Sequence, residues 1–328
     1  MGGVEAHSPP AFVGQAGLVR RVFSRIGAER PQSVAVIGGR RSGKTALLAY
    51  IADEAVRARS LEQPGRYLFL QPCANCSGVP DPDTFLAALL EPLPRPATGG
   101  GNRYEAVRAL IQRLHADGRR LIVLLDDFHL VTGSERFPLE FFSFLRSMAN
   151  NYNLAYVTTS ILELQKLCVV KDVQESPFFN IFTNLHLGML PPAEAAALLA
   201  GLAGVDAGGA ARIASWTGGS PWLLRRAADA LRREKAVLPV DEQGIERLLQ
   251  KDAFALYEEV VALLPPAAHR ALQAVARGRQ PDPAEAHHLV PLVKQGFLAE
   301  ADGLACAIPA FAAFLRRAFT ARMLKGRE

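Results

Sequence analysis

The sequence contains no apolar run as long as a membrane span. A helix needs about 20 consecutive apolar residues to cross a bilayer, and no run in the 328 residues reaches this length. The first ten residues, MGGVEAHSPP, also lack the charged and apolar regions of a secretory signal. We therefore expect a cytoplasmic protein with no membrane partner.

Cysteine is scarce, with four residues in the whole chain. This number is too small for a disulfide framework in a protein of this length. Cys73 and Cys76 form a single CxxC, and Cys168 and Cys306 supply no second pair with zinc spacing. The sequence therefore predicts neither a disulfide scaffold nor a zinc centre.

Charge of either sign is moderate. The net charge is +5, and 49% hydrophobic with 21% charged residues is ordinary for a globular protein. Such a balance permits DNA or an acidic protein as a partner but supplies no extended basic tail. A length of 328 residues indicates two or three domains.

In the first half of the chain, short β-branched runs alternate with helical patterns. This alternation predicts a doubly wound α/β fold built on a parallel sheet. Three glycines in residues 97–102 (ATGGGN) indicate a loop. The expected strands are residues 32–38, 66–70, 121–125, 154–159 and 185–190, and the expected helices are 44–59, 104–116 and 137–148.

The second half of the sequence predicts mainly helices. Residues 193–202, 210–216 and 221–233 predict a small helical lid, and 254–264, 267–276 and 283–295 predict three more helices before a strand–turn–strand over 297–307. Three helices and a hairpin outline a winged helix. The expected domains are thus 1–190 (α/β), 191–250 (helical lid) and 251–328 (winged helix).

A winged helix can read DNA through its recognition helix, which would be residues 283–295. This segment carries one lysine, Lys294, and no arginine, whereas phosphate contacts dominate DNA affinity. A structural role is therefore favoured over DNA contact. At the C-terminal end, we predict an amphipathic helix with an apolar docking face and a solvated basic edge, formed by Phe311, Phe314, Leu315, Arg316, Arg317 and Arg322.

The strongest motif is GGRRSGKT, residues 38–45, which matches the phosphate-binding loop GxxxxGK[ST]. Gly38 and Gly43 let the backbone wrap around phosphates with its N–H groups inward. Lys44 would reach the β and γ phosphates, and the Thr45 hydroxyl would bind magnesium. The remaining predicted nucleotide contacts are Gly39, Arg40, Arg41, Ser42 and Ala46.

Two further strands end in polar residues. Asp126 follows the apolar strand LIVLL and is the predicted magnesium-side carboxylate, and Asp127 is the candidate to polarise the attacking water. The strand LAYVTTS places Thr158 and Thr159 at the same sheet edge, where either could sense the γ-phosphate or simply end the strand. His129 receives no role.

Several strings, in this order, resemble the AAA+/STAND branch of P-loop ATPases over about residues 11–235. They are Phe12-Val13-Gly14-Gln15, similar to an "FVGR" box with Gln15 in place of arginine, then residues 32–51 (QSVAVIGGRRSGKTALLAYI), 176–190 (SPFFNIFTNLHLGML), and Gly219-Ser220-Pro221, similar to a lid "GxP" signature. The residues look most like the novel STAND domain of bacteria and its archaeal ATPase relatives.

The resemblance implies adenine rather than guanine, and no guanine-reading Asn-Lys-x-Asp string follows the fourth strand. It also implies that Val13 lies at the nucleotide site and that Pro221 packs on adenine. Many ATPases of the additional-strand class have glutamate at the position of Asp127, so the shorter aspartate implies slow hydrolysis. Arg136 and Arg146 are the candidates for an arginine finger.

The resulting hypothesis is an ATP- and magnesium-dependent switch that assembles as a homo-oligomer or with a separate sensor or effector protein, in signalling or in defence against mobile elements. An alternative is a DNA-associated ATPase similar to origin initiators or transposition regulators. A scaffold that binds nucleotide without turnover is a third reading.

Overall fold

The computed structural model describes residues 12, 14–72, 75–91, 102–234, 242–300 and 302–320. They divide into two compact units. Unit 1 contains Ala16–Gly38 and Lys44–His186, and unit 2 contains Gly14 and Gln15, Gly39–Gly43 and the chain from Leu187 onward. No helix in the described part of the chain combines the length and apolarity that a membrane span requires.

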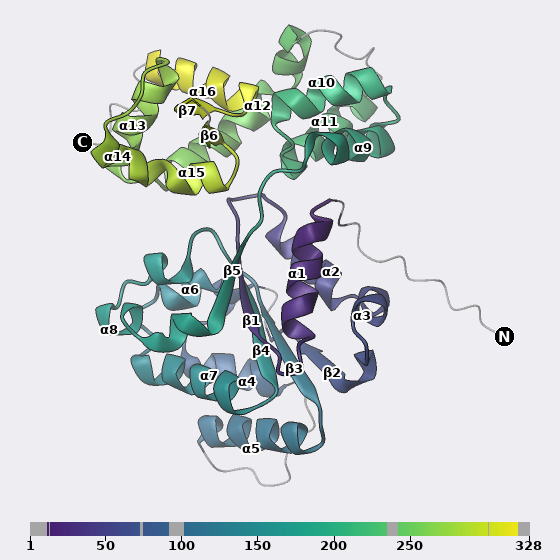
Figure 1. Ribbon diagram of the computed structural model, residues 1–328, viewed down its shortest axis with the longest axis vertical. Coiled ribbons are helices and arrows are strands. Elements are labelled where there is room, and N and C mark those ends of the chain that lie inside the picture. Colours follow the sequence, from purple (N-terminus) through teal and green to yellow (C-terminus); the bar gives the residue numbers. More distant parts are fainter. Residues whose placement is uncertain are drawn as a thin grey trace, which may run out of the picture. The chain divides into compact units, whose positions relative to one another are not determined.

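Unit 1 is built on a five-stranded sheet in the order β2-β3-β4-β1-β5, in which all neighbours are parallel (Figure 1). β4 is therefore inserted between the strand that precedes the phosphate loop and the strand that precedes the two aspartates. The strands are β1 (Ser33–Ile37), β2 (Tyr67–Leu70), β3 (Arg120–Leu125), β4 (Leu154–Ser160) and β5 (Phe182–His186).

Helices cover both faces of this sheet (Figure 1). One side carries α1 (Ala16–Ile26), α2 (Lys44–Ala52) and α3 (Glu54–Ser60). The other side carries α4 (Pro82–Leu90), α5 (Arg103–Ala116), α6 (His129–Thr132), α7 (Leu139–Asn151) and α8 (Lys171–Gln174). Short 3-10 helices occupy Pro64–Arg66, Cys76–Gly78, Leu164–Leu167 and Pro177–Ile181.

The inner strands are apolar on both faces because helices cover both sides. In β3, Leu121 and Val123 pack into a cluster with Phe85 and Phe141, while Ile122, between them, is equally buried on the opposite face. The predicted parallel α/β architecture is thus confirmed.

Two boundaries in unit 1 differ from the prediction. The helix expected over 44–59 is two helices, because Asp53 has an extended backbone and its carboxylate accepts a hydrogen bond from Val56 N at 3.0 Å, which caps α3. The strand expected over 185–190 lies at Phe182–His186. Leu190 instead joins the core of unit 2. Residues 97–101 of the expected glycine loop lie outside the described residues.

Unit 2 is helical apart from one hairpin. Its helices are α9 (Pro192–Ala203), α10 (Ala207–Thr217), α11 (Pro221–Glu234), α12 (Glu242–Val261), α13 (Pro266–Ala276), α14 (Pro283–Ala286), α15 (Val290–Lys294) and α16 (Pro309–Thr320), with a 3-10 turn at His287–Leu289. β6 (Leu298–Glu300) and β7 (Leu304–Cys306) pair antiparallel.

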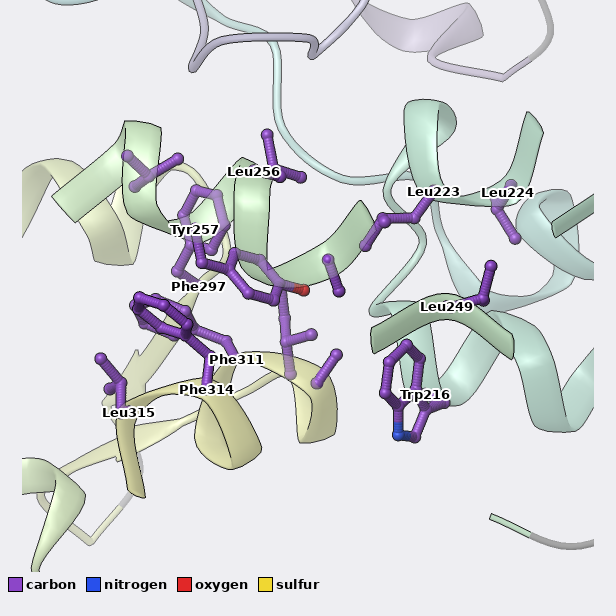
Figure 2. Packing of buried hydrophobic residues seen from close by; sticks show 14 of the residues in the cluster. Trp216, Leu223, Leu224, Leu249, Leu256, Tyr257, Phe297, Phe311, Phe314 and Leu315 are labelled. Carbon is purple, nitrogen blue, oxygen red and sulfur yellow. The ribbon is translucent and has the colours of Figure 1, made fainter. Parts of the chain in front are cut away.

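One apolar core runs through unit 2. Figure 2 shows Tyr257, Phe297, Phe311 and Phe314 packed together, with Trp216 among the leucines of the same cluster. The rings of Tyr257 and Phe311 are 5.1 Å apart between centroids. Because α12 crosses residue 250 without a break, the structure groups the expected lid and C-terminal segment in one unit. Their division at residue 250 stays a prediction.

Two expectations for the C-terminal segment are wrong. Residues 283–295 do not form one helix: they are split into α14, a 3-10 turn and α15, with Pro291 in the first turn of α15. The apolar face of α16 is not a docking face, because Phe311 and Leu315 are buried in the unit's own core. Arg316 and Arg317 are exposed as predicted, and Arg322 lies outside the described residues.

Candidate nucleotide-binding site

The predicted site residues of unit 1 meet at the carboxyl edge of the sheet, where ligands of open α/β sheets bind. β1 ends just before Gly38, β3 just before Asp126, and β4 at Ser160. The backbone N–H of Gly38 donates to the carbonyl of Ser160 at 3.0 Å, which ties the start of the phosphate loop to β4.

The phosphate loop has the backbone that its motif demands. Gly43 has a φ of 100°, a left-handed conformation that glycine adopts without strain. Lys44 is the first residue of α2, is 8% exposed, and donates from Nζ to the carbonyl of Gly38 at 3.0 Å. The lysine thus closes the loop on itself, and its ammonium group is held where the motif puts the phosphates.

Ser42 supplies a test of whether the loop fits a phosphate. Its Oγ is buried and has no hydrogen-bond partner within the described residues. Buried hydroxyls are normally paired, so an unpaired one indicates a missing ligand or water. A phosphate oxygen is an acceptor of the right kind, and the loop therefore fits a nucleotide phosphate.

Asp126 is the centre of a hydroxyl–carboxylate cluster. Its Oδ2 accepts from Thr45 Oγ1 at 2.6 Å, and its Oδ1 accepts from Thr159 Oγ1 at 2.5 Å. The residue is 2% exposed. A short hydrogen bond to a charged oxygen is stronger than a neutral one, so both hydroxyls are held firmly. A hydroxyl and a carboxylate oxygen are also the hard donors that magnesium prefers.

Asp127 is held differently from Asp126. Its φ of 51° is left-handed, and its N–H donates to Thr159 Oγ1 at 2.8 Å. Its carboxylate, 29% exposed, accepts from Asn75 Nδ2 at 3.1 Å and lies 3.8 Å from His129 Nδ1. Asp127 is therefore a fixed but solvent-accessible carboxylate, as a group that polarises a water requires.

Thr159 connects the two aspartates, because its hydroxyl bonds the carboxylate of one and the backbone of the other. Thr158 points elsewhere: its Oγ1 lies 3.5 Å from the carbonyl of Val34 within the sheet. Of the two threonines, the geometry thus favours Thr159 as the residue at the nucleotide-binding edge. Whether it senses a γ-phosphate stays a prediction.

Sequence reasoning missed Asn75 and gave His129 no role, yet both flank Asp127. The signal for Asn75 was its place in the sequence, five residues after β2, which is the strand beside β3. No pattern distinguishes such a residue from an ordinary loop asparagine. His129 follows Asp127 by two residues and begins α6.

The two loop arginines differ. Arg40 is exposed. Arg41, which belongs to unit 2, has a left-handed φ of 60°, lies with its guanidinium carbon 4.2 Å from the ring centroid of Trp222, and has Nη2 2.5 Å from Glu259 Oε1. Both charged side chains are 34% exposed, so the ion pair adds little stability by itself.

Gln15 and Gly219 each belong to a motif that resembles STAND proteins, and both residues contact the same segment of unit 2. Gln15 donates from Nε2 to the carbonyls of Gly188 at 3.2 Å and Met189 at 2.9 Å. Leu190 N donates to Gly219 O at 2.9 Å, and any Cβ on Gly219 would collide with the carbonyl of Leu190. Two separate strings therefore fix residues 188–190.

The other predicted positions are less constrained. Pro221 is half-buried in the first turn of α11, Ala46 is half-buried in α2, and Val13 lies outside the described residues. Their contacts with nucleotide stay predictions. Of the finger candidates, Arg136 is exposed, whereas Arg146 is half-buried with its Nε enclosed.

Cys73 lies outside the described residues, and Cys76, its partner in the CxxC, is buried. Within the described ranges, no group of three or more histidine, cysteine or acidic side chains is arranged to hold a metal ion.

A comparison with family models matches residues 28–219 to Novel STAND NTPase 2. This range is more than half of the 328 residues. The chain belongs to this family. It is therefore a P-loop NTPase of the STAND type, as the resemblance implied. A search of curated protein sequences gives no match.

Solved structures show the same fold at low identity. The ORC2 protein of Aeropyrum pernix, in ADPNP–ADP complexes, is 16% identical with a TM-score of 0.61, and the match covers 98% of this chain and 97% of that one. A Walker-type ATPase of Pyrococcus abyssi is 14% identical with a TM-score of 0.62, covering 93% and 96%. Drosophila ORC bound to DNA is 14% identical with a TM-score of 0.50, covering 95% and 89%.

These structures share the fold of this chain over most of its length. They do not establish the winged helix, which stays a prediction.

Proposed function

We propose that this STAND-family chain binds ATP with magnesium and hydrolyses it slowly as a conformational switch. The observation that carries the proposal is the cluster in which Thr159 joins Asp126, the partner of Thr45, to Asp127, the solvent-accessible carboxylate. This arrangement separates a metal-side carboxylate from a water-side carboxylate, which hydrolysis of a phosphoanhydride requires.

Each residue has a defined task in this proposal. The N–H groups of the loop and Lys44 bind the phosphates, and the Thr45 hydroxyl with Asp126 holds magnesium, which when bound neutralises phosphate charge. Asp127 orients the attacking water. Asn75 donates to one oxygen of the same carboxylate, Oδ2, at 3.1 Å and so orients it, while the carboxylate keeps further acceptor sites for a water.

The same proposal assigns adenine as the base and a homo-oligomer or a hetero-complex as the working assembly. Both assignments rest on family membership, in which nucleotide state controls a larger change. Signalling or defence against mobile elements is the setting proposed on the same ground.

The first test compares wild type with Lys44→Ala. Removal of the ammonium group leaves the phosphates without their principal charge partner, so we expect ATP binding and turnover to fall by about 100-fold or more. ATP affinity and phosphate release are measured on the full chain, with thermal unfolding as the fold control. An unchanged ATPase rate in a folded variant would overturn the site assignment.

The second test measures oligomeric mass with ATP–magnesium, with ADP and with neither, each with and without duplex DNA. Assembly that needs ATP alone supports the self-contained switch. Assembly that needs DNA supports the alternative, a DNA-associated ATPase, and a constant mass in all conditions contradicts assembly of this chain by itself.

A further inference from the structure

A groove on unit 1 lies away from the nucleotide-binding edge. It has a volume of about 640 Å³ and follows one face of α1. Five of its residues belong to α1 and recur at helical spacing, which places them on a single stripe. The lining residues are Gly17, Arg20, Arg21, Ser24, Arg25, Ala28 and Gln32.

The groove belongs to the amino edge of the sheet. Gln32 directly precedes β1, whereas Gly38 directly follows it. Five residues of strand lie between these two positions, which are therefore about 20 Å apart. The groove is therefore a second surface and not an extension of the phosphate loop.

The charge of the groove is positive and uncompensated. α1 contains three arginines and no acidic residue. Arg25 donates from Nη1 to Gln32 Oε1 at 2.6 Å, a neutral amide that leaves its charge unbalanced. Arg20 and Arg21 are exposed and have no ion pair within the described part of the chain.

The opposite face of α1 makes this surface rigid. Leu18, Val22 and Ile26 are buried against unit 1, with exposed fractions of 6%, 0% and 0%. The helix cannot turn without exposing them, so the arginines stay on the outer face. The other two helical residues of the lining, Gly17 and Ser24, are small and leave room beside the arginine side chains.

The lining selects a class of ligand. It contains no aromatic side chain, so it offers nothing on which an unpaired base could stack. It also contains no large apolar side chain for a hydrophobic ligand. Guanidinium groups bind phosphate oxygens in paired hydrogen bonds. The lining therefore favours a ligand that presents several anionic groups along a surface, and phosphates are one such group.

We propose that this arginine groove binds the phosphate backbone of duplex DNA without reading its sequence. Arg21 and Arg25 lie one helical turn apart, about 6 Å along the axis, and duplex DNA presents a phosphate charge about every 1.7 Å of its axis. Several phosphates are thus always within reach of the stripe, whatever the base sequence.

The predicted recognition segment provides a weaker surface for the same ligand. Lys294 is the single lysine or arginine in residues 283–295, and that segment is broken into short helices. The three arginines of α1 therefore carry three times the charge of Lys294, and they do so on one continuous helix.

The test measures binding of a labelled 30-base-pair duplex to the full chain by fluorescence anisotropy over a range of salt concentrations. Arg20→Ala/Arg21→Ala removes two charges from the groove. Arg113→Ala/Arg119→Ala is the matched control, because it removes two exposed arginines from another part of unit 1. Alanine is a strong helix former, so α1 should stay folded.

We expect the groove variant to lose about tenfold or more in affinity and the slope of log affinity against log salt to fall by about 2, since each arginine contributes about one unit. The control should change affinity less than about twofold, with a slope close to that of wild type. ATP affinity should be the same in all three proteins.

Three results would overturn the proposal. Equal losses of affinity in both double variants would show that binding depends on diffuse surface charge and not on the groove. An absence of salt-dependent binding by wild type would show that duplex DNA is not a ligand. Competition decides the source of the anion: polyglutamate or inorganic triphosphate that displaces the duplex as well as unlabelled duplex does would show an acidic-protein or free-phosphate site instead.

Discussion

Buried polar side chains are used differently in the two units. In unit 1 they gather at the carboxyl edge of the sheet, where Asp126 and Thr159 are 2% and 0% exposed and bond one another. In unit 2 the centre is an aromatic cluster, and the buried hydroxyl of Tyr257 has no partner within the described residues. Both units have an apolar core, and unit 1 adds to its core a bonded cluster of buried polar groups at the sheet edge.

The difference indicates where each unit is sensitive. A buried charge remains favourable only while its hydrogen bonds are made, so the Asp126 cluster has one working arrangement. An apolar core tolerates chemical change as long as its volume is kept. Substitutions at the edge of unit 1 should therefore change activity most, and those in unit 2 should change stability most.

The largest effect on activity beyond the phosphate loop should come from Asp127→Asn. The amide keeps the shape of the side chain but cannot accept a proton from water, so we expect turnover to fall about 100-fold, or about 2.7 kcal/mol. ATP affinity should change little, because the metal-side carboxylate is Asp126. Single-turnover hydrolysis and equilibrium binding are measured together. Equal turnover in the variant would place the catalytic base elsewhere.

The next effect should come from Gly219→Ala in unit 2. Gly219 has a φ of 74°, and a Cβ there would collide with the carbonyl of Leu190. We expect a loss of about 2–4 kcal/mol in the free energy of unfolding, from backbone strain and overpacking together.

Gly204→Ala is the control for this change. Gly204 has a φ of 65°, yet a Cβ there would have no atom within 4 Å. Only the backbone strain remains, and the expected loss is about 1–2 kcal/mol. Denaturant unfolding of both variants separates strain from collision. Equal losses would show that the contact with Leu190 does not matter.

The smallest effects should come from a matched pair of tyrosines. Burial raises the pKa of both hydroxyls, Tyr156 in unit 1 and Tyr257 in unit 2. The hydroxyl of Tyr156 donates to the carbonyl of Leu145 at 3.0 Å, whereas that of Tyr257 has no partner within the described residues.

Tyr156→Phe should therefore cost about 1 kcal/mol, since it removes the buried hydrogen bond from the hydroxyl to the Leu145 carbonyl. Tyr257→Phe should be neutral or stabilising by up to about 1 kcal/mol, because it removes an unpaired polar group from an apolar core. Chemical unfolding of the two variants gives both values. A loss in Tyr257→Phe as large as that in Tyr156→Phe would mean that its hydroxyl is bonded in solution.

The sequence alone determined the phosphate loop and the parallel sheet. The motif GGRRSGKT fixes backbone conformation by its glycines, and Gly43 indeed has a left-handed φ. The run LIVLL is typical of a strand buried on both faces. Asp126, Asp127 and Thr159 followed from one rule, that the carboxyl ends of parallel strands share an edge.

The tertiary structure alone decided which side chains bond across that edge. Asn75 meets Asp127 because β2 lies beside β3, and strand order depends on contacts between residues far apart in sequence. The same holds for α16, whose apolar stripe looked like a docking face until Tyr257 and Phe297 were found to cover it. A local pattern predicts that the apolar face of a helix is buried. Only the tertiary structure determines which residues cover that face.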